Sequence, residues 1–160
     1  MNALSSVVSE IKVSYQPTKI DNKKIKTSLD AYEIMKQYFD EDTLALQETF
    51  IIMFLNQSNM PIGVYTISKG GITSTIVDIR LILAVALKCA CTGLVLAHNH
   101  PSGGLKPSSP DLKLTEKIRA GCKLLDIKLF DHLIISPYNS YYSMADSGDL
   151  YGCSLNEGVS

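Results

Sequence analysis

A strand that ends in two histidines constrains the fold of this chain more than any other feature of its sequence. The run GLVLAHNH, residues 93–100, is apolar until it reaches His98 and His100. Alternate residues of a strand point to the same face, so both imidazoles are expected to leave the strand together. Packing both rings in a core would require several buried hydrogen-bond partners. A metal site would use the two rings directly, and the sequence therefore predicts one here.

A third candidate ligand lies on the helix that follows. A loop rich in proline, glycine and serine leads to Ser109, a predicted helix cap, and then to Pro110 and Asp111 in the first turn. Two histidines and one aspartate are typical of an open, catalytic zinc site. We expect one Zn²⁺ per chain, with a water at the remaining position whose pKa zinc lowers from about 15.7 to 7. Iron or manganese would accept a similar set of ligands.

The remaining patterns predict a layered α/β domain in one piece. Helices are expected over residues 29–40, 78–91 and 109–125, and strands over residues 48–56, 62–70, 93–100, 127–136 and 140–146. Ser28 is the predicted cap of the first helix. The second helix is apolar nearly all round, which is typical of a helix buried in a core.

The domain is expected to cover residues 28–150. Residues 1–27 are predicted as an N-terminal arm with one short strand at residues 10–15, and residues 151–160 as a flexible tail. The chain has 160 residues, of which 46% are hydrophobic and 19% charged. This length and composition are typical of one folded domain with a well-buried core.

The composition also argues against several partners and settings. The formal net charge is -1, so no overall positive field attracts nucleic acid or anionic lipid. The apolar stretch at residues 81–87 is far shorter than the roughly 20 residues that span a bilayer, and the first residues lack a signal-peptide pattern. The four cysteines form no Cys-x-x-Cys pair and are expected to be free thiols. We therefore expect a cytoplasmic protein without a membrane partner.

The chemistry of an open metal site also needs a base that takes a proton from water. Glu48 is the candidate, because it opens the otherwise apolar run ETFIIMFLN at residues 48–56. A positioned carboxylate of this kind typically contributes about 10²–10⁴-fold in rate. The alternative interpretation is a solvated glutamate at the edge of a strand. The pattern by itself leaves both interpretations open.

Four of these residues together resemble a known family signature. His98, His100, Ser108 and Asp111 follow the spacing His-x-His, seven residues, Ser, two residues, Asp. This spacing resembles the JAMM signature of the JAB/MPN metalloprotease superfamily. The longer string beginning HNHPSG, together with DHLIIS at residues 131–136, is similar to the RadC-like branch of that superfamily.

The resemblance covers about residues 44–150 and implies both a fold and a site. The implied fold has three layers, α-β-α, of the cytidine-deaminase-like kind with a mixed sheet. The implied site holds zinc and uses a glutamate on an early strand, a place that Glu48 occupies. Ser108 would correspond to the signature serine, which hydrogen-bonds near the metal-bound water or the developing oxyanion. Such a donor is worth roughly 2.7–4 kcal/mol. The alternative for Ser108 is a loop or helix-cap serine, and both roles can coexist.

Other residues of the motif receive more modest interpretations. Ser102 and Gly103 match the PSG segment of the RadC-like branch and are interpreted as loop-shaping residues. The third histidine, His132, follows Asp131 in a predicted strand. It is interpreted as a histidine of the core, or one that contacts a ligand, rather than as a ligand itself.

These observations leave three functions open. The first is a zinc-dependent hydrolase that cleaves peptide or isopeptide bonds of a protein or peptide substrate, with Glu48 activating the zinc-bound water. The second is a non-catalytic binding module, against which the intact ligand set argues. The third is a role in DNA repair or recombination, traditionally attached to RadC-like proteins, although residues 1–27 are too few and too polar for the helix-hairpin-helix region that many of them carry. Base deamination is excluded because the chain lacks the Pro-Cys-x-x-Cys ligand pair.

Overall fold

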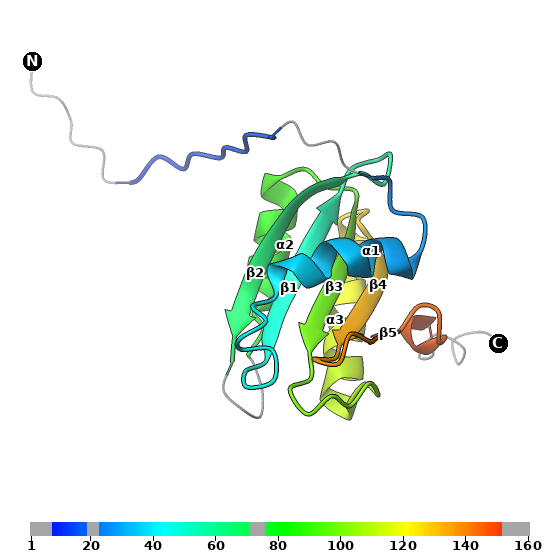
Figure 1. Ribbon diagram of the computed structural model, residues 1–160. Coiled ribbons are helices and arrows are strands. Elements are labelled where there is room, and N and C mark those ends of the chain that lie inside the picture. The colour runs from blue at the N-terminus through cyan, green and yellow to red at the C-terminus, as the bar shows by residue number, and fades with distance from the viewer. Residues whose placement is uncertain (1–7, 19–22, 71–75, 152–160) are drawn as a thin grey trace, which may run out of the picture.

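The structure, a computed structural model, describes residues 8–18, 23–70 and 76–151 (Figure 1). Its elements in chain order are α1 (Ser28–Met35), the short 3-10 helix η1 (Lys36–Tyr38), β1 (Thr49–Leu55), β2 (Pro61–Lys69), α2 (Ile79–Lys88), β3 (Gly93–Asn99), α3 (Ser109–Leu124), β4 (Lys128–Ile135), β5 (Tyr141–Ser143) and the 3-10 helix η2 (Asp149–Tyr151). The order of α-helices and strands agrees with the order predicted from the sequence, and their ends differ by a few residues.

The five strands form one mixed sheet in the order β2-β1-β3-β4-β5. The pair β3–β4 is parallel, and the other three neighbouring pairs are antiparallel. Figure 1 shows α1 across one face of the sheet and α2 and α3 against the other. The predicted three-layer α/β/α fold with a mixed sheet is therefore confirmed.

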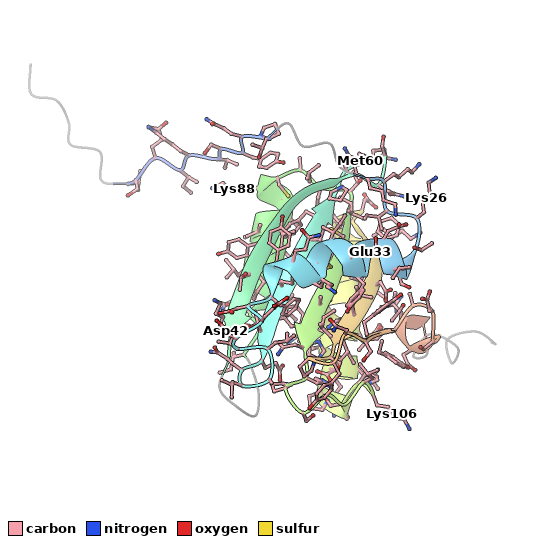
Figure 2. The ribbon with its side chains drawn as sticks, viewed as in Figure 1. Lys26, Glu33, Asp42, Met60, Lys88 and Lys106 are labelled. Carbon is pink, nitrogen blue, oxygen red and sulfur yellow. The ribbon has the colours of Figure 1, made fainter. Side chains whose placement is uncertain are left out.

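The core consists of two apolar layers, one on each face of the sheet. Figure 2 draws the described side chains around the ribbon. The strands β1 and β3 are buried along their whole length. In β1, Phe50 and Ile52 face α2 and α3, whereas Ile51 and Met53 face α1. A central strand that is covered on both faces has apolar residues at nearly every position. This explains the continuous apolar sequence that follows Glu48.

Three predictions, on α1, on α2 and on the N-terminal arm, were wrong. The cap of α1 is Thr27 rather than Ser28, because the Thr27 side chain accepts the hydrogen bond from the backbone of Asp30. The helix α2 is not buried all round: Ile82 is fully buried, but Leu87 on its outer side is 56% exposed. The segment at residues 10–15 is described but forms no strand.

Other expectations concern cysteines, membranes and the chain ends. Cys89, Cys91 and Cys122 are free thiols, as expected, and Cys153 lies outside the described residues. No helix within residues 8–18, 23–70 and 76–151 has the length and apolar character needed to cross a bilayer. The predicted tail, apart from its first residue in η2, also lies outside the described residues.

The capping box of α1 predicts a pH-dependent part of the stability. The Asp30 carboxylate accepts hydrogen bonds from the Lys23 side chain and from the N–H groups of Lys26 and Thr27, which hold its pKa below the usual range. The unfolded chain then binds this proton more readily, so the contribution is present above about pH 4 and is lost as the pH falls. Asp30→Asn should lower the urea midpoint at neutral pH, and the gap from wild type should narrow in acid. A gap that stays constant with pH would contradict this.

Candidate metal centre

The three predicted ligands come together at one end of the sheet. His98 is the penultimate residue of β3, His100 follows the strand, and Asp111 lies in the first turn of α3. In Figure 1 the arrowhead of β3 and the start of α3 lie at the same end of the molecule, and Lys106 marks the loop between them in Figure 2. Ligand sites are common at the carboxyl ends of strands in α/β sheets, because loops and helix starts meet there.

The spacing of the ligand atoms suits a small tetrahedral ion. His98 Nε2 lies 3.0 Å from His100 Nε2 and 3.3 Å from Asp111 Oδ1, whereas His100 Nε2 lies 3.3 Å from the other carboxylate oxygen, Asp111 Oδ2. One donor atom from each of the three residues can be chosen so that all lie within 4.8 Å of one another. Ligands that bind zinc at about 2.0–2.1 Å in tetrahedral geometry are roughly 3.3 Å apart. These three side chains can therefore hold one metal ion, and their identities do not by themselves select zinc over other divalent ions.

The hydrogen bonds of His100 leave its second nitrogen for a cation. His100 Nδ1 lies 2.7 Å from the carbonyl oxygen of Gly104, which can only accept, so Nδ1 carries a proton. In the neutral ring, Nε2 then presents a lone pair toward Asp111. The hydrogen bond from His100 to Asp111 raises the pKa of His100. A proton or a metal ion can therefore balance the Asp111 carboxylate at this place, and the donor set fits a metal.

The start of α3 orients the Asp111 carboxylate. Ser108, not Ser109 as predicted, is the cap of α3: its Oγ accepts from the N–H of Asp111, and its own N–H donates to Asp111 Oδ2 at 2.7 Å. Burial raises the pKa of Asp111, but its close neighbours His100 and His98 outweigh burial and hold the pKa well below the usual range. Asp111 is therefore a carboxylate with a fixed direction. Ser108 thus has the helix-cap role, which is one of the two roles that the sequence analysis left open for it.

The loop after β3 fixes the orientation of His100. The N–H of Gly103 donates to the carbonyl of His100 at 2.9 Å, which closes a turn and brings the Gly104 carbonyl back to the imidazole. Gly103 has a positive φ of 84°, which favours glycine, and an added Cβ would lie 2.5 Å from the ring of Tyr138. These contacts agree with the interpretation of Gly103 as a loop-shaping residue.

Glu48 lies next to this cluster, on the segment that leads into β1. Phe50 pairs with His98 across β1 and β3, and Glu48 lies two residues before Phe50, just outside the strand that begins at Thr49. Burial raises the pKa of Glu48, and the charges of His98, Asp111 and His100 act on it as well. Its carboxyl group is therefore partly desolvated and within electrostatic reach of all three candidate ligands.

Asn99 holds the segment that carries Glu48, a role that the sequence interpretation missed. The side chain is fully buried; its oxygen accepts from the N–H of Thr49 at 2.7 Å, and its amide donates to the carbonyls of Leu44 and Gln47 at 2.7 and 2.9 Å. An asparagine within a buried strand was the available signal, because a buried amide must find partners. Its partners, however, lie about 50 residues away in the sequence.

Replacing Asn99 should loosen Glu48 without removing any of the three candidate metal ligands. Asn99→Leu would leave the Thr49 N–H and two carbonyls without these partners, at a cost of roughly 1–3 kcal/mol for each group that stays unpaired. We expect a lower urea midpoint, a lower kcat and unchanged metal content, measured on the same preparation. Gln57→Leu, which removes an exposed amide in the turn before β2, is the control. Unchanged kcat in a destabilised but folded Asn99→Leu would contradict the positioning of Glu48 by Asn99.

His132 lies behind His98 on the neighbouring strand β4. Its ring is fully buried, and burial, followed by the charge of His98, holds its pKa well below the usual value. His132 Nε2 lies 2.7 Å from His98 Nδ1. The structure thus places His132 beside one candidate ligand and outside the group formed by His98, His100 and Asp111.

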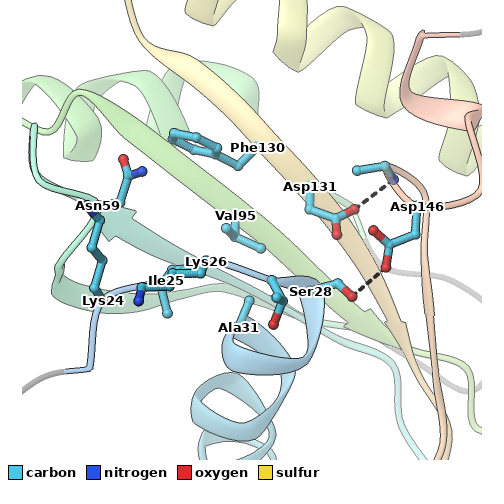
Figure 3. Close-up of a pocket in the computed structure, with 12 residues that line it drawn as sticks. Lys24, Ile25, Lys26, Ser28, Ala31, Asn59, Val95, Phe130, Asp131 and Asp146 are labelled. Atoms are coloured by element: carbon cyan, nitrogen blue, oxygen red, sulfur yellow. Dashed lines mark hydrogen bonds between the residues drawn. The ribbon is translucent and has the colours of Figure 1, made fainter.

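A separate cavity of about 430 Å³ lies on the α1 face of the sheet (Figure 3). Val95 lines it, and because alternate residues of β3 point to opposite faces, this cavity lies across the sheet from His98. Asp131 and Asp146 line it together at one end (Figure 3). Asp131 accepts from the N–H of Ala145, and Asp146 accepts from the hydroxyl of Ser28. Both carboxylates are thus engaged within the fold, and we assign the cavity no ligand.

Comparison with protein families and curated proteins identifies relatives of this chain. Residues 25–149 match the model of the RadC-like JAB domain. A UPF0758 protein of Flavobacterium johnsoniae is 47% identical over 126 residues, which cover 79% of this chain and 53% of that protein. A UPF0758 protein of Porphyromonas gingivalis is 41% identical over 64% of this chain and 45% of its own length. One of Streptococcus gordonii is 34% identical over 88% of this chain and 62% of its own length. The chain thus spans about half the length of these relatives, whose names state no activity.

Proposed function

Because the chain belongs to the RadC-like JAB domain family, we propose that it is a zinc-dependent hydrolase of amide bonds that acts on a peptide or isopeptide bond of a protein. The observation that carries the proposal is the convergence of two imidazole nitrogens, 3.0 Å apart, on the Asp111 carboxylate, whose two oxygens each lie 3.3 Å from one of these nitrogens, with a partly desolvated Glu48 nearby. Closed structural zinc sites use four protein ligands, whereas three ligands with a neighbouring carboxylate suit catalysis.

The residues of the chain have distinct tasks in this proposal. His98, His100 and Asp111 would hold the metal, which supplies a Lewis acid for the amide carbonyl and acidifies a water. Glu48 takes a proton from the attacking water and later delivers it to the leaving amine. Water oxygen becomes bonded to the carbonyl carbon, the C–N bond breaks, and the products are a carboxylate and an amine.

Two environmental features support these tasks. Burial raises the pKa of Glu48, which brings a carboxylate closer to the basicity that a general base needs near neutral pH. The Ser108 hydroxyl accepts the N–H of Asp111 and still has its own proton to donate. A donor at this place would stabilise the negative charge that develops on the substrate oxygen.

The proposal is tested on the full chain with and without metal. Zinc-loaded, chelator-stripped and reloaded protein would be incubated with peptide and isopeptide substrates that release a fluorophore. We expect hydrolysis that is lost on stripping and returns with zinc. A chain that keeps no metal after zinc is added and the excess removed would contradict the proposal. A steeply salt-dependent affinity for DNA in the same preparation would instead favour the repair-associated alternative.

A further inference from the structure

A continuous chain of hydrogen bonds lies behind the candidate metal centre. His98 Nδ1 lies 2.7 Å from His132 Nε2, and His132 Nδ1 lies 2.6 Å from the Thr115 hydroxyl. The same hydroxyl lies 2.7 Å from the carbonyl oxygen of Asp111. Thr115 belongs to α3 and His132 to β4, and both side chains are buried. These hydrogen bonds therefore connect the candidate ligand His98 to the backbone of a second candidate ligand, Asp111. They pass through two residues to which the proposed function assigns no task.

The Asp111 carbonyl determines which atom donates in each hydrogen bond of this series. A carbonyl oxygen only accepts hydrogen bonds, and a hydroxyl has one proton to give. The spacing of 2.7 Å between the Thr115 and Asp111 oxygens is that of an O–H···O hydrogen bond, so the proton lies between them. Met144 Sδ, at 3.7 Å from the hydroxyl, is a more distant and weaker acceptor. Thr115 therefore has no proton left for His132 and accepts one from it.

His132 transmits this direction to His98. Burial disfavours the charged imidazolium, and the ring nitrogens of His132 contact a second imidazole and a hydroxyl, so the ring is neutral and has a single proton. That proton is on Nδ1, which donates to Thr115, so Nε2 of His132 is an acceptor. His98 must then donate from its own Nδ1. Its Nε2 is left with a lone pair that faces His100 at 3.0 Å and Asp111 at 3.3 Å.

We propose that Thr115 and His132 are positioning residues that hold His98 in the tautomer with the proton on Nδ1, and thereby aim the Nε2 lone pair into the metal site. The opposite tautomer would place a proton on Nε2, where a metal would bind, and would remove this ligand. The use of the lone pair rests on the proposed function. The tautomer itself is a property of the metal-free chain, and it can be observed without any metal or substrate.

The first test reads the tautomers directly in the metal-free protein. Long-range ¹H–¹⁵N correlation spectra of the labelled full chain, in weakly alkaline buffer, show which ring nitrogen carries the proton, and the chain has only three histidines. We expect the proton on Nδ1 in both His98 and His132. Thr115→Ser keeps the hydroxyl and should keep both tautomers. Thr115→Val has nearly the same shape without the hydroxyl and should move His98 toward the Nε2 proton. A wild-type His98 protonated on Nε2 overturns the proposal, even if no variant folds.

The second test measures zinc affinity by competition with a chelator. Loss of a residue that orients a metal ligand typically weakens binding about 10–100-fold, and we expect this for Thr115→Val but not for Thr115→Ser. At residue 132, the glutamine introduced by His132→Gln has an amide oxygen that can still accept a hydrogen bond from His98. This variant should therefore bind zinc more tightly than His132→Leu. Unfolding midpoints of the metal-free variants separate this effect from a general loss of stability.

The two tests distinguish a failed inference from a failed function. Equal zinc affinity of folded Thr115→Val and wild type overturns the positioning role and leaves the hydrolase proposal in place. A wild-type chain that binds no zinc, but whose His98 carries its proton on Nδ1, overturns the hydrolase proposal and supports the tautomer assignment. Weaker zinc binding in Thr115→Val together with a changed His98 tautomer supports both the tautomer assignment and the positioning role.

Discussion

Glu48→Gln is expected to lower kcat by about 10²–10⁴-fold while leaving metal content unchanged. Glutamine has nearly the same shape as glutamate but cannot take a proton from water. Glu48 is outside the group of three candidate ligands, so the metal site keeps its donors. The measurements are kcat on a substrate identified with the wild-type chain and zinc per chain by elemental analysis of the same samples.

The matched control for this prediction is Glu41→Gln, the same chemical change at an exposed position of the segment before β1. This variant should retain the wild-type kcat. Because burial raises the pKa of Glu48, the acid limb of the wild-type rate profile should also lie above the pKa of an ordinary glutamate, about 4.3. Wild-type turnover in Glu48→Gln would show that another group takes the proton, and the mechanism would then be wrong.

His100→Ala should reduce bound zinc from about one ion per chain to almost none, and turnover should be lost with it. The change leaves two of three protein ligands, and it also removes the ring that Gly104 orients. The ring is 18% exposed and lies after β3 rather than in the core, so the metal-free fold should survive. Elemental analysis, with a circular dichroism spectrum of the same sample, checks both expectations.

Lys106→Ala is the control for His100→Ala, because Lys106 is exposed on the loop between His100 and Asp111 (Figure 2). It should bind zinc as the wild type does. Equal zinc in His100→Ala and wild type would remove His100 from the ligand set. It would also weaken the argument from the three short distances, because two side chains would then suffice to retain the ion.

The candidate ligand residues could be found from the sequence because local rules place them. Alternation along a strand puts His98 and His100 on one face, and helix capping puts Asp111 in a first turn. The same local rules also gave wrong predictions about helices. The cap of α3 is Ser108, one residue before the predicted one, since either serine could precede Pro110 and only the backbone geometry selects between them. The helix α2 was wrongly expected to be buried because an apolar composition does not show which side meets the sheet.

The sequence by itself thus determined the class of the fold, the order of its elements and the cluster of two histidines and an aspartate. Only the tertiary structure decided the order of the strands, the attachment of the Glu48 segment to Asn99, and the path from Thr115 through His132 to His98. The physical reason is the sequence separation over which each kind of interaction acts. Alternation and capping act over two to four residues, whereas a buried polar group is satisfied by whichever partner the packed sheet and helices bring to it, here 17 to 55 residues away.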